Sequence, residues 1–276
     1  MELSGSYFNY DGVTSRLYDL VFANVDTSRN LAMSGQIDSM TIFNKSNRRS
    51  YFIGESADDS ALTFEAEIVV ADDKPIDYET QREITKWLFR QQDYRKLYVD
   101  NYCDSAGETF DMVDGEEKRT YLNCRFTNPS KIESGSGVIG FKFDIECDCG
   151  FAWQEPVIST FVFDETSPST GVIEVDVDTD ALDYVNPVVR ITTGKTGGDI
   201  SIINLTDNPT RTTKFVGLGA NVQFVMKSDG VNYVSGDNYM KFVDRNFVRL
   251  LDGINRISIT GDVAKIEFEF QNKRFL

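Results

Sequence analysis

Apolar and polar residues alternate along most of this chain, and that period of two is what most constrains its fold. Successive side chains of a strand point to opposite faces of a sheet, so strict alternation predicts a strand with one buried face. The clearest runs cover residues 62–70, 139–149 and 173–178. Two further runs flank Gly261-Asp262 near the C-terminus, and we expect them to pair as a hairpin. The pattern predicts a mainly β protein.

One segment, residues 77–92, has helical spacing instead. Its inward-facing candidates are Ile84, Trp87 and Leu88, which recur three and four residues apart. Two N-caps fit the start of this helix: Asp77, or Thr80 with Glu83 three residues later as a capping box. We expect a single helix, lying on a sheet with Trp87 and Leu88 turned inward.

The chain has 276 residues, enough for one large or two ordinary domains. A strong strand pattern ends at Cys149-Gly150, and a fresh series of strands begins near Val172. We therefore expect a boundary near Trp153, with an N-terminal domain of residues 1–152 and a C-terminal domain of residues 153–276. Closely spaced turn residues in the second half are typical of a compact β-sandwich.

The charge and the missing histidine exclude several functions. The chain has 28 basic and 44 acidic residues, a net charge of −16, and no histidine. Ser-His-Asp and Cys-His catalysis and His-based zinc sites are therefore excluded. The acidic surface also argues against sequence-independent binding of nucleic acid. Residues 1–150 carry 16 basic and 27 acidic groups, and residues 151–276 carry 12 and 17, so the first half holds −11 of the −16.

The sequence shows neither a membrane span nor an export signal. No apolar run reaches the ~18 residues that cross a bilayer, and the first residues lack the features of a signal peptide. We expect synthesis in a cytoplasm without an export route. There the four cysteines should be reduced, small buried side chains: Cys103, Cys124, Cys147 and Cys149.

Three motifs suggest metal or phosphate chemistry, and each is incomplete. Asp176, Asp178 and Asp180 open like a calcium loop, but the glycine and glutamate that an EF-hand needs are replaced by alanine and proline. Gly194-Lys195-Thr196 lacks the earlier glycine of a phosphate-binding loop and predicts a turn. Cys147, Cys149 and Cys124 lack a fourth zinc ligand. We expect no catalytic residue, no metal and no cofactor.

A small basic cluster stands out in the acidic first half. Lys45, Arg48 and Arg49 lie in the polar run 44–50, between apolar stretches at 40–43 and 51–53. One interpretation is the solvated tip of a hairpin. The other is an arm that meets an acidic neighbouring subunit, which makes these three residues the candidate subunit interface.

Four short motifs occur in an order that is similar to a known family. They are Phe8-Asn9-Tyr10-Asp11-Gly12 with Ser15 and Leu20-Val21-Phe22; the helix followed by Lys96-Leu97-Tyr98-Val99-Asp100; Gly140 to Asp148 running into Phe151-Ala152; and Leu251-Asp252-Gly253-Ile254-Asn255-Arg256-Ile257. Together they resemble the distal tail (Dit) proteins of bacteriophages over nearly the whole chain. The resemblance rests on the order and spacing of these motifs along the chain.

The resemblance implies a non-enzymatic hub at the virion tail tip, assembled in the bacterial host cytoplasm. It implies an N-terminal β-sandwich or barrel-like domain with one α-helix, followed by a C-terminal galectin-like β-sandwich. In that family the N-terminal domains form a hexameric ring that joins the tail-tube protein to the tail-associated lysin or fibre, and in some phages the ring holds receptor-binding proteins. DNA passes through such a ring without specific binding, and an acidic lumen suits that passage.

Two alternatives stay open. One is a carbohydrate-binding adsorption protein that contacts host cell-wall glycans, with Tyr233 and Tyr239 as stacking candidates. Against it, both tryptophans (Trp87 and Trp153) lie in the first half or at the junction, and the run 208–211 resembles a galectin sugar motif only superficially. The other is a histidine-free glycoside hydrolase, but nothing singles out a carboxylate pair among 44.

Overall fold

The computed structural model describes most of the chain, with short gaps. It covers residues 5–25, 37–44, 48–57, 61–72, 74–99, 112–113, 116–117, 120–163, 171–181, 183–228 and 233–274. The chain divides into two compact units, Met1–Gln154 with Arg274–Leu276 and Glu155–Lys273. Each unit has its own hydrophobic core. We call them unit 1 and unit 2 and describe each by itself.

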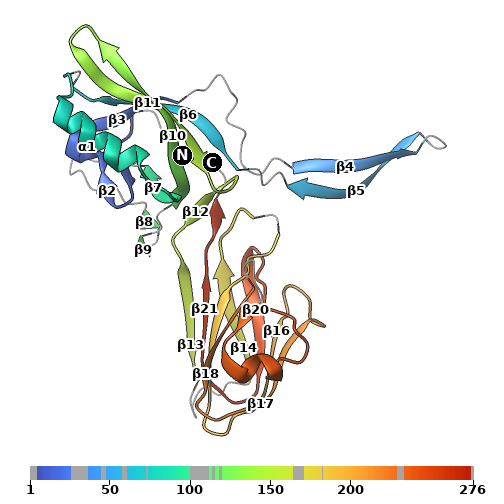
Figure 1. The fold of residues 1–276 in the computed structure, drawn as a ribbon. Coiled ribbons are helices and arrows are strands. Elements are labelled where there is room, and N and C mark those ends of the chain that lie inside the picture. The colour runs from blue at the N-terminus through green and yellow to red at the C-terminus, as the bar shows by residue number, and fades with distance from the viewer. Residues whose placement is uncertain are drawn as a thin grey trace. The chain divides into compact units, whose positions relative to one another are not determined.

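Unit 1 is built on a nine-stranded antiparallel sheet (Figure 1). Its main path runs β2-β1-β7-β10-β11-β6-β3. The strands are β1 (Phe8–Tyr10), β2 (Val13–Thr14), β3 (Leu20–Val25), β6 (Thr63–Val70), β7 (Arg95–Val99), β10 (Thr120–Ser134), β11 (Gly137–Cys147), β12 (Ala152–Gln154) and β22 (Lys273–Arg274). The alternation predicted for β6 and β11 is confirmed, since every second residue of each strand is buried over most of its length.

Two small two-stranded sheets also belong to unit 1. One pairs β4 (Ile37–Asn44) with β5 (Arg49–Ala57), and the other pairs β8 (Met112–Val113) with β9 (Glu116–Glu117). Among the described residues, neither hairpin is hydrogen-bonded to the nine-stranded sheet.

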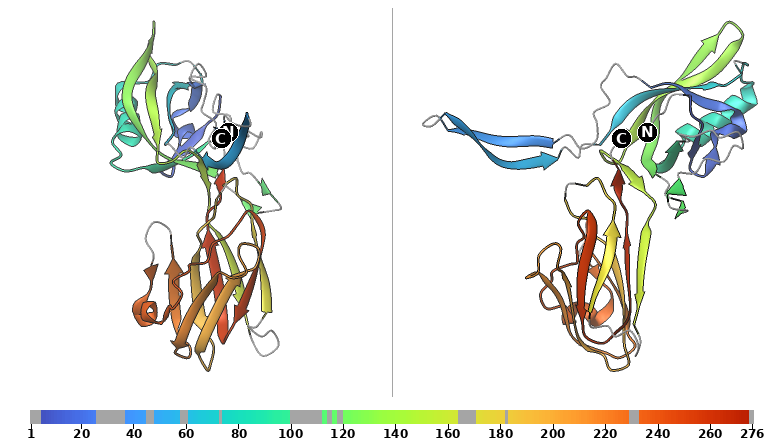
Figure 2. Two further views of the ribbon diagram at one scale, coloured as in Figure 1. Left: turned by 90° about the vertical axis from the view of Figure 1, so that its right-hand side faces the viewer. Right: turned by 180° about the vertical axis from the view of Figure 1, so that it is seen from behind.

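The predicted helix is present as α1 (Tyr78–Phe89), which packs on the nine-stranded sheet (Figure 2). Asp77 is its N-cap, because the Asp77 carboxylate accepts the backbone N–H groups of Glu79 and Thr80 at 3.0 Å each. Ile84 and Leu88 are fully buried. No helix in the described parts of the chain is long and apolar enough to cross a bilayer.

Trp87 ties this helix to the opening motif of the chain. Its indole N–H donates to the Tyr10 carbonyl at 2.9 Å, and its ring stacks on Phe8 with centroids 5.9 Å apart. Asp11 and Gly12 both have positive φ, as the tight turn between β1 and β2 requires. The opening motif therefore positions the helix on the sheet.

Unit 2 is a sandwich of two antiparallel sheets around one core. The five-stranded sheet runs β13-β21-β15-β18-β19, and the four-stranded sheet runs β14-β20-β16-β17. The strands are β13 (Val157–Val162), β14 (Gly171–Val177), β15 (Val188–Thr193), β16 (Gly198–Asn204), β17 (Thr212–Leu218), β18 (Gln223–Lys227), β19 (Tyr233–Val234), β20 (Gly253–Thr260) and β21 (Val263–Phe270). The mainly β fold class is confirmed.

The prediction that the chain ends in a hairpin around Gly261-Asp262 is wrong. Strand β20 lies in the four-stranded sheet and β21 in the five-stranded sheet, so Gly261 and Asp262 carry the chain across the sandwich. Each strand has a row of buried apolar residues, and placing the strands in opposite sheets turns both rows into the same core. If both strands lay in one sheet, their apolar rows would lie side by side, and another layer of the protein would have to cover them.

Candidate interaction surfaces

Two residues of the predicted basic cluster, Arg48 and Arg49, lie at the tip of the β4–β5 hairpin. The two strands pair in antiparallel register from Ile37 opposite Ala57 to Asn44 opposite Arg49. Arg48 lies in the connection, exposed, with a φ of 53°. Arg49 is the first residue of β5, and Lys45 lies outside the described residues. The structure thus shows the hairpin, while its role as a subunit interface stays a prediction.

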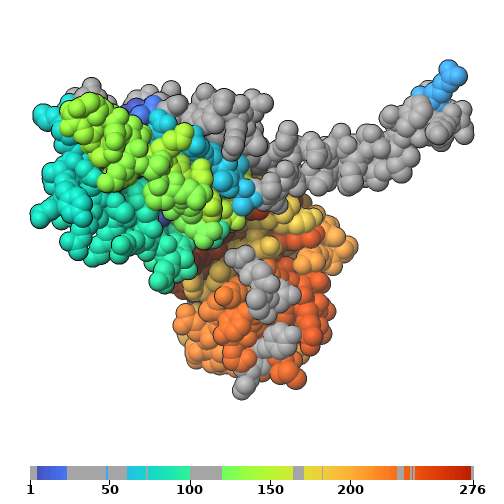
Figure 3. Space-filling view, turned by 45° about the horizontal axis from the view of Figure 1, so that its top comes forward, coloured from blue at the N-terminus to red at the C-terminus, as the bar shows by residue number. Residues whose placement is uncertain are grey.

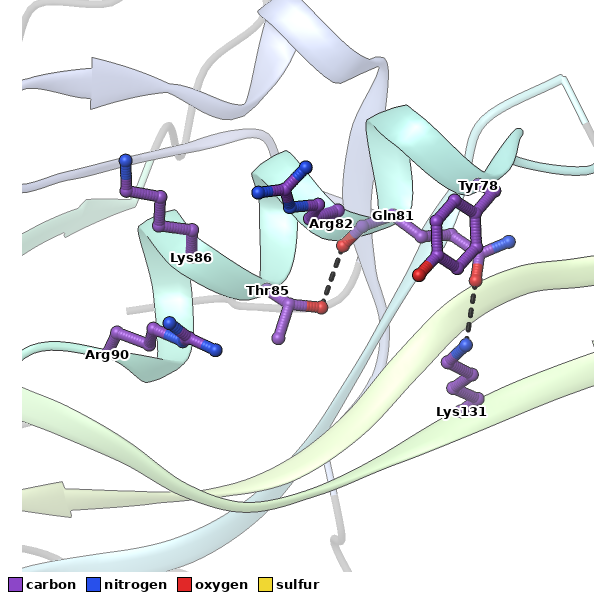
Figure 4. A pocket seen from close by; sticks show the side chains of 7 residues that line it. All are labelled: Tyr78, Gln81, Arg82, Thr85, Lys86, Arg90 and Lys131. Atoms are coloured by element: carbon purple, nitrogen blue, oxygen red, sulfur yellow. Dashed lines mark hydrogen bonds between the residues drawn. The ribbon is translucent and has the colours of Figure 1, made fainter.

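A second basic surface, which the sequence analysis did not single out, lies on the exposed side of α1. A pocket of about 480 Å³ is open there. It is lined by Tyr78, Gln81, Arg82, Thr85, Lys86, Arg90 and Lys131 (Figure 4). Four of the seven are cations and none is a carboxylate. We call Arg82, Lys86, Arg90 and Lys131 the cationic face.

Three of these cations form a row on α1 and its C-cap. Arg82, Lys86 and Arg90 recur every four residues, which places them about one turn apart along the same side of the helix. That spacing is visible in the sequence, but it is a common arrangement on solvated helices. Only the pocket that they line, with Lys131 from β10, distinguishes them.

Hydrogen bonds fix the base of this pocket. Lys131 Nζ donates to Gln81 Oε1 at 2.8 Å, and Thr85 Oγ1 donates to the Gln81 carbonyl at 2.7 Å. The first of these contacts connects α1 to the long β10–β11 hairpin, and the second lies within the helix. In the space-filling view, the teal surface of the helix lies beside the green surface of that hairpin (Figure 3).

The cationic face differs from the sheet beside it, where cations and carboxylates neutralise each other. Arg125 contacts Glu146 at 2.7 Å and holds the pKa of that carboxyl below its usual value. Lys142 reaches Glu65 at 2.5 Å. By contrast, Arg82, Lys86 and Arg90 take part in no ion pair within the described part of the chain. Their positive charge is therefore available to another molecule.

The cysteines are packing residues. Cys124 and Cys147 are buried and face each other across β10 and β11, whereas Cys149 is only half-buried. All three are free thiols, and burial raises the pKa of Cys147 and of Cys149 to about 12. Cys103 lies outside the described residues. Within those residues, no group of three or more cysteines and carboxylates could hold a metal ion.

The phosphate-loop motif is a turn, as expected. Gly194-Lys195-Thr196 connects β15 to β16 and is followed by a strand. Asp262 closes this loop, because its carboxylate accepts the Thr196 N–H at 2.6 Å and the Gly197 N–H at 3.0 Å. The hydrogen bonds from Thr196 lower the pKa of Asp262. The backbone N–H groups of this loop thus bind the carboxylate of Asp262, a residue of the same unit.

The calcium-like motif lies along the solvent side of β14. Asp176 and Asp178 are exposed, while the valines that alternate with them are buried in the core of unit 2. Asp180 is partly exposed in the segment that follows the strand. This is the arrangement expected for the outer face of a strand that runs into a turn.

The carbohydrate alternative receives little support from unit 2. The run 208–211 is the turn between β16 and β17, where the side-chain oxygen Oδ1 of Asn208 accepts the Thr210 N–H at 2.9 Å and the Thr210 hydroxyl at 2.8 Å. The asparagine side chain is thus used to close its own turn. Tyr233 is 45% exposed on β19, and Tyr239 lies in the short 3-10 helix Gly236–Lys241.

Comparisons with known proteins agree with the architecture. Two family models match, one described as phage tail protein N-terminal domain over residues 3–149 and one as phage tail C-terminal domain over residues 151–270. No curated protein sequence matches the chain.

Solved structures with the same fold come from phage tails. The crystal structure of the Dit protein (gp 19.1) of phage SPP1, described as a paradigm of a hub adsorption apparatus, has 13% identity and a TM-score of 0.64, covering 96% of this chain and 98% of its own. Two structures of the activated phage p2 baseplate, with Ca and with Sr, each have 9% identity, cover 97% of this chain and 98% of theirs, and score 0.51 and 0.50. The predicted resemblance to Dit proteins is confirmed at the level of the fold.

Proposed function

The chain belongs to the phage tail protein family whose N- and C-terminal domain models it matches, and on this premise we propose that it is a structural hub of a phage tail tip or baseplate. The observation that carries the proposal is the similarity to the SPP1 Dit protein, which extends over 96% of this chain and therefore includes both units. A hub at this place is a virion component without a reaction to catalyse, in keeping with a chain that has no histidine.

The hub is proposed to be a hexameric ring made by residues 1–152, which continues the tail tube. Residues 153–276 form the galectin-like domain, with an architectural role. The ring joins the tail-tube protein to the tail-associated lysin or fibre and provides a place for receptor-binding proteins. The −11 charge of residues 1–150 supports this arrangement, because an acidic lumen repels the phosphates of passing DNA.

The β4–β5 hairpin is proposed to be the arm that reaches a neighbouring subunit. A two-stranded hairpin is at best marginally stable alone in water, so it needs a surface to pack against. Within the described residues it has no third strand. With Arg48 and Arg49 at its tip and Lys45 three residues before Arg48 in the sequence, the surface that it fits best is acidic, and every copy of this chain has a net charge of −16.

The mass of the protein in solution tests the ring. Six copies of 31.2 kDa give about 187 kDa for a closed hexamer by light scattering, and electron micrographs should show a six-fold ring with a central hole. A species that stays monomeric at high concentration in physiological salt, also in the presence of the tail-tube protein, would refute the proposal.

Charge reversal at the tip tests the arm. Arg48→Glu with Arg49→Glu should weaken ring formation and leave the melting of the monomer nearly unchanged, because Arg48 is exposed and the hairpin is paired with no strand of the nine-stranded sheet among the described residues. The matched control reverses Lys227 and Lys241 in unit 2, which changes the net charge equally. Normal rings from the Arg48/Arg49 variant would show that the arm does not carry the contact.

A further inference from the structure

We propose that strand β13 binds β13 of a second copy of the chain, antiparallel to it and about a two-fold axis. The contact lies wholly in unit 2, whereas the ring put forward above is made by residues 1–152, so each proposal can fail without the other. Two features of the described residues lead to it: β13 is a sheet edge without protection, and its sequence is complementary to itself.

Among the described strands, the backbone of β13 pairs on one side only. Its partner is β21, and β13 forms the end of the five-stranded sheet (Figure 1). The Phe163 N–H donates to the Ala264 carbonyl at 2.9 Å, and the direction of these groups alternates along a strand. The N–H and C=O groups of Ile158, Thr160 and Val162 therefore point away from the sheet, where no described strand pairs with them.

β13 also lacks the features that protect exposed edges from pairing. Natural edge strands are blunted by charged side chains, prolines, bulges or short length. β13 has six residues, pairs with β21 without a register shift, and contains neither a charged residue nor a proline. The other edges of unit 2 are protected: β14 contains Glu174 and Asp176, β19 has two residues, and β17 contains Lys214 and is bridged by Phe242.

The side chains at this edge leave apolar surface in water. On the outer face, Ile158 and Val162 are 57% and 66% exposed. On the core face, Val157, Phe161 and Phe163 pack against the core of unit 2 but are only partly buried. A strand added beside β13 would cover both faces and bury apolar area on each of them.

The sequence of β13 makes a second copy of itself the strand that fits. In an antiparallel pair centred on Thr160, Thr160 lies opposite Thr160, and Ile158 of each copy lies opposite Val162 of the other. These residues carry the outward-pointing N–H and C=O groups, so each pair exchanges both of its hydrogen bonds. Apolar pairs and threonine pairs stabilise antiparallel strands, and this register brings no charges face to face.

Other registers fit less well. A shift by one residue sets the outward-pointing groups of one copy opposite groups of the other that already bond to β21. A shift by two residues in one direction sets Val162 opposite Pro156, which has no N–H to donate. A shift by two in the other direction sets the apolar Ile158 opposite the carboxylate of Asp164. The register centred on Thr160 therefore uses the strand completely.

The contact is isologous, since the same strand meets itself, and such contacts close as two-fold dimers. Neighbours in a six-fold ring are related by a sixth of a turn, so β13 pairs join copies of two different rings or two free copies. Pairing through β13 therefore doubles the species that unit 1 forms. The doubled mass is about 374 kDa for two rings of six and about 62 kDa for two free copies of 31.2 kDa.

Two variants of the full chain that differ at one position test the pairing and its register. The first carries Ile158→Lys with Val162→Lys, which places lysines of the two copies opposite each other. The second carries Ile158→Lys with Val162→Glu, which places a lysine of each copy opposite a glutamate of the other. The matched control carries Val172→Lys with Ile254→Lys at two exposed apolar residues of the four-stranded sheet, and it has the same net charge as the first variant.

Sedimentation at increasing protein concentration measures the association. The first variant should associate at least about tenfold more weakly than the wild type, because like charges directly opposite each other repel. The second variant and the control should stay within about threefold of the wild type. Added salt should leave the wild-type contact unchanged or strengthen it, because backbone hydrogen bonds and apolar burial carry it.

A disulfide reports the same contact directly. Thr160→Cys should give a disulfide-linked dimer on oxidation, because the Cα atoms of a hydrogen-bonded pair lie about 5.5 Å apart, within the range of a disulfide. Thr260→Cys, at an exposed threonine of β20, is the matched control. The wild type, with its four cysteines, gives the background.

Three results would overturn the proposal. They are a first variant that associates like the wild type, a second variant that associates as weakly as the first, and a Thr160→Cys protein with no more linked dimer than its control. The masses separate this contact from the ring. A species of six copies that does not double supports the ring and refutes the β13 contact, whereas a species of two copies does the reverse, and a strict monomer refutes both.

Discussion

Replacing Asn255 should destabilise unit 2 strongly, because this fully buried side chain holds the turn that precedes β20. Its carbonyl oxygen accepts the Leu251 N–H and the Asn204 amide, each at 2.8 Å. Its own amide donates to the Leu251 carbonyl at 2.7 Å and the Gly253 carbonyl at 3.0 Å. All four hydrogen-bonding contacts thus come from one side chain, the asparagine of the closing sequence motif.

Asn255→Ala leaves three of these groups without a partner, the Leu251 N–H and the carbonyls of Leu251 and Gly253, whereas the Asn204 amide still donates to the Arg249 carbonyl. A buried polar group that loses its partner costs about 1–3 kcal/mol, so three such groups at the low end of that range give about 3 kcal/mol. Unit 2 spans Glu155–Lys273, and a domain of that size has an unfolding entropy of about 0.25 kcal/mol/K. The expected fall in the melting temperature of unit 2 is therefore about 12 °C.

Calorimetry combined with tryptophan fluorescence makes the measurement specific. Both tryptophans, Trp87 and Trp153, lie in unit 1, so fluorescence reports unit 1 while calorimetry reports both units. Asn208→Ala, in an exposed turn of unit 2, is the matched control and should cost less than about 1 kcal/mol. The reasoning is refuted if Asn255→Ala lowers the melting temperature by less than about 4 °C, or if the fluorescence transition moves instead.

Three further predictions concern particular residues. Gly261→Ala should destabilise unit 2 by about 2 kcal/mol or more in calorimetry. The reason is that Gly261 has a φ of 118° and that a Cβ there would lie 2.3 Å from the Asp199 carbonyl oxygen. A melting temperature equal to that of the wild type would contradict this. Asp77→Ala should lower the melting temperature of unit 1 at pH 7. Hydrogen bonds from Thr80 hold the pKa of Asp77 below its usual value. The stabilisation that the Asp77 carboxylate gives to the folded protein is therefore complete above its unfolded pKa and is lost as pH falls through its folded pKa. A lower melting temperature of the variant that persists in strong acid would be inconsistent with this. Cys124 and Cys147 should react with Ellman's reagent at pH 8 only after denaturation, because burial raises the pKa of both thiols; rapid labelling of either in the folded protein would show that the site is open.

Local patterns were sufficient for individual elements. The alternation in β6 and β11 identified which side chains are buried, because the pleat turns alternate residues to opposite faces. The helical spacing of Ile84 and Leu88 identified the buried side of α1 in the same way. The choice between the two N-caps required the structure, since both Asp77 and Thr80 fit the sequence rule and only the backbone geometry places Asp77 at the cap.

The cationic face shows why functional surfaces were harder to predict. Arg82, Lys86 and Arg90 are neighbours on one helix, and their spacing is visible in the sequence. Lys131 lies on β10, some forty residues further along the chain, and it reaches the helix through Gln81. The neutralisation of carboxylates by nearby cations was hard to predict for the same reason, because Lys142 and Glu65 lie close together only if their strands are neighbours in the sheet.

By itself, the sequence determined the mainly β class, the helix at Tyr78–Phe89 and the buried side of the elements with a clear repeat, because all of these follow from the periods of strand and helix. Only the tertiary structure decided which strands become neighbours. β20 and β21 follow each other with two residues between them and have the alternation of a hairpin, yet they lie in opposite sheets. An alternating pattern predicts that one face of a strand is buried, but it does not identify the strands that cover this face. Those strands come from distant parts of the chain.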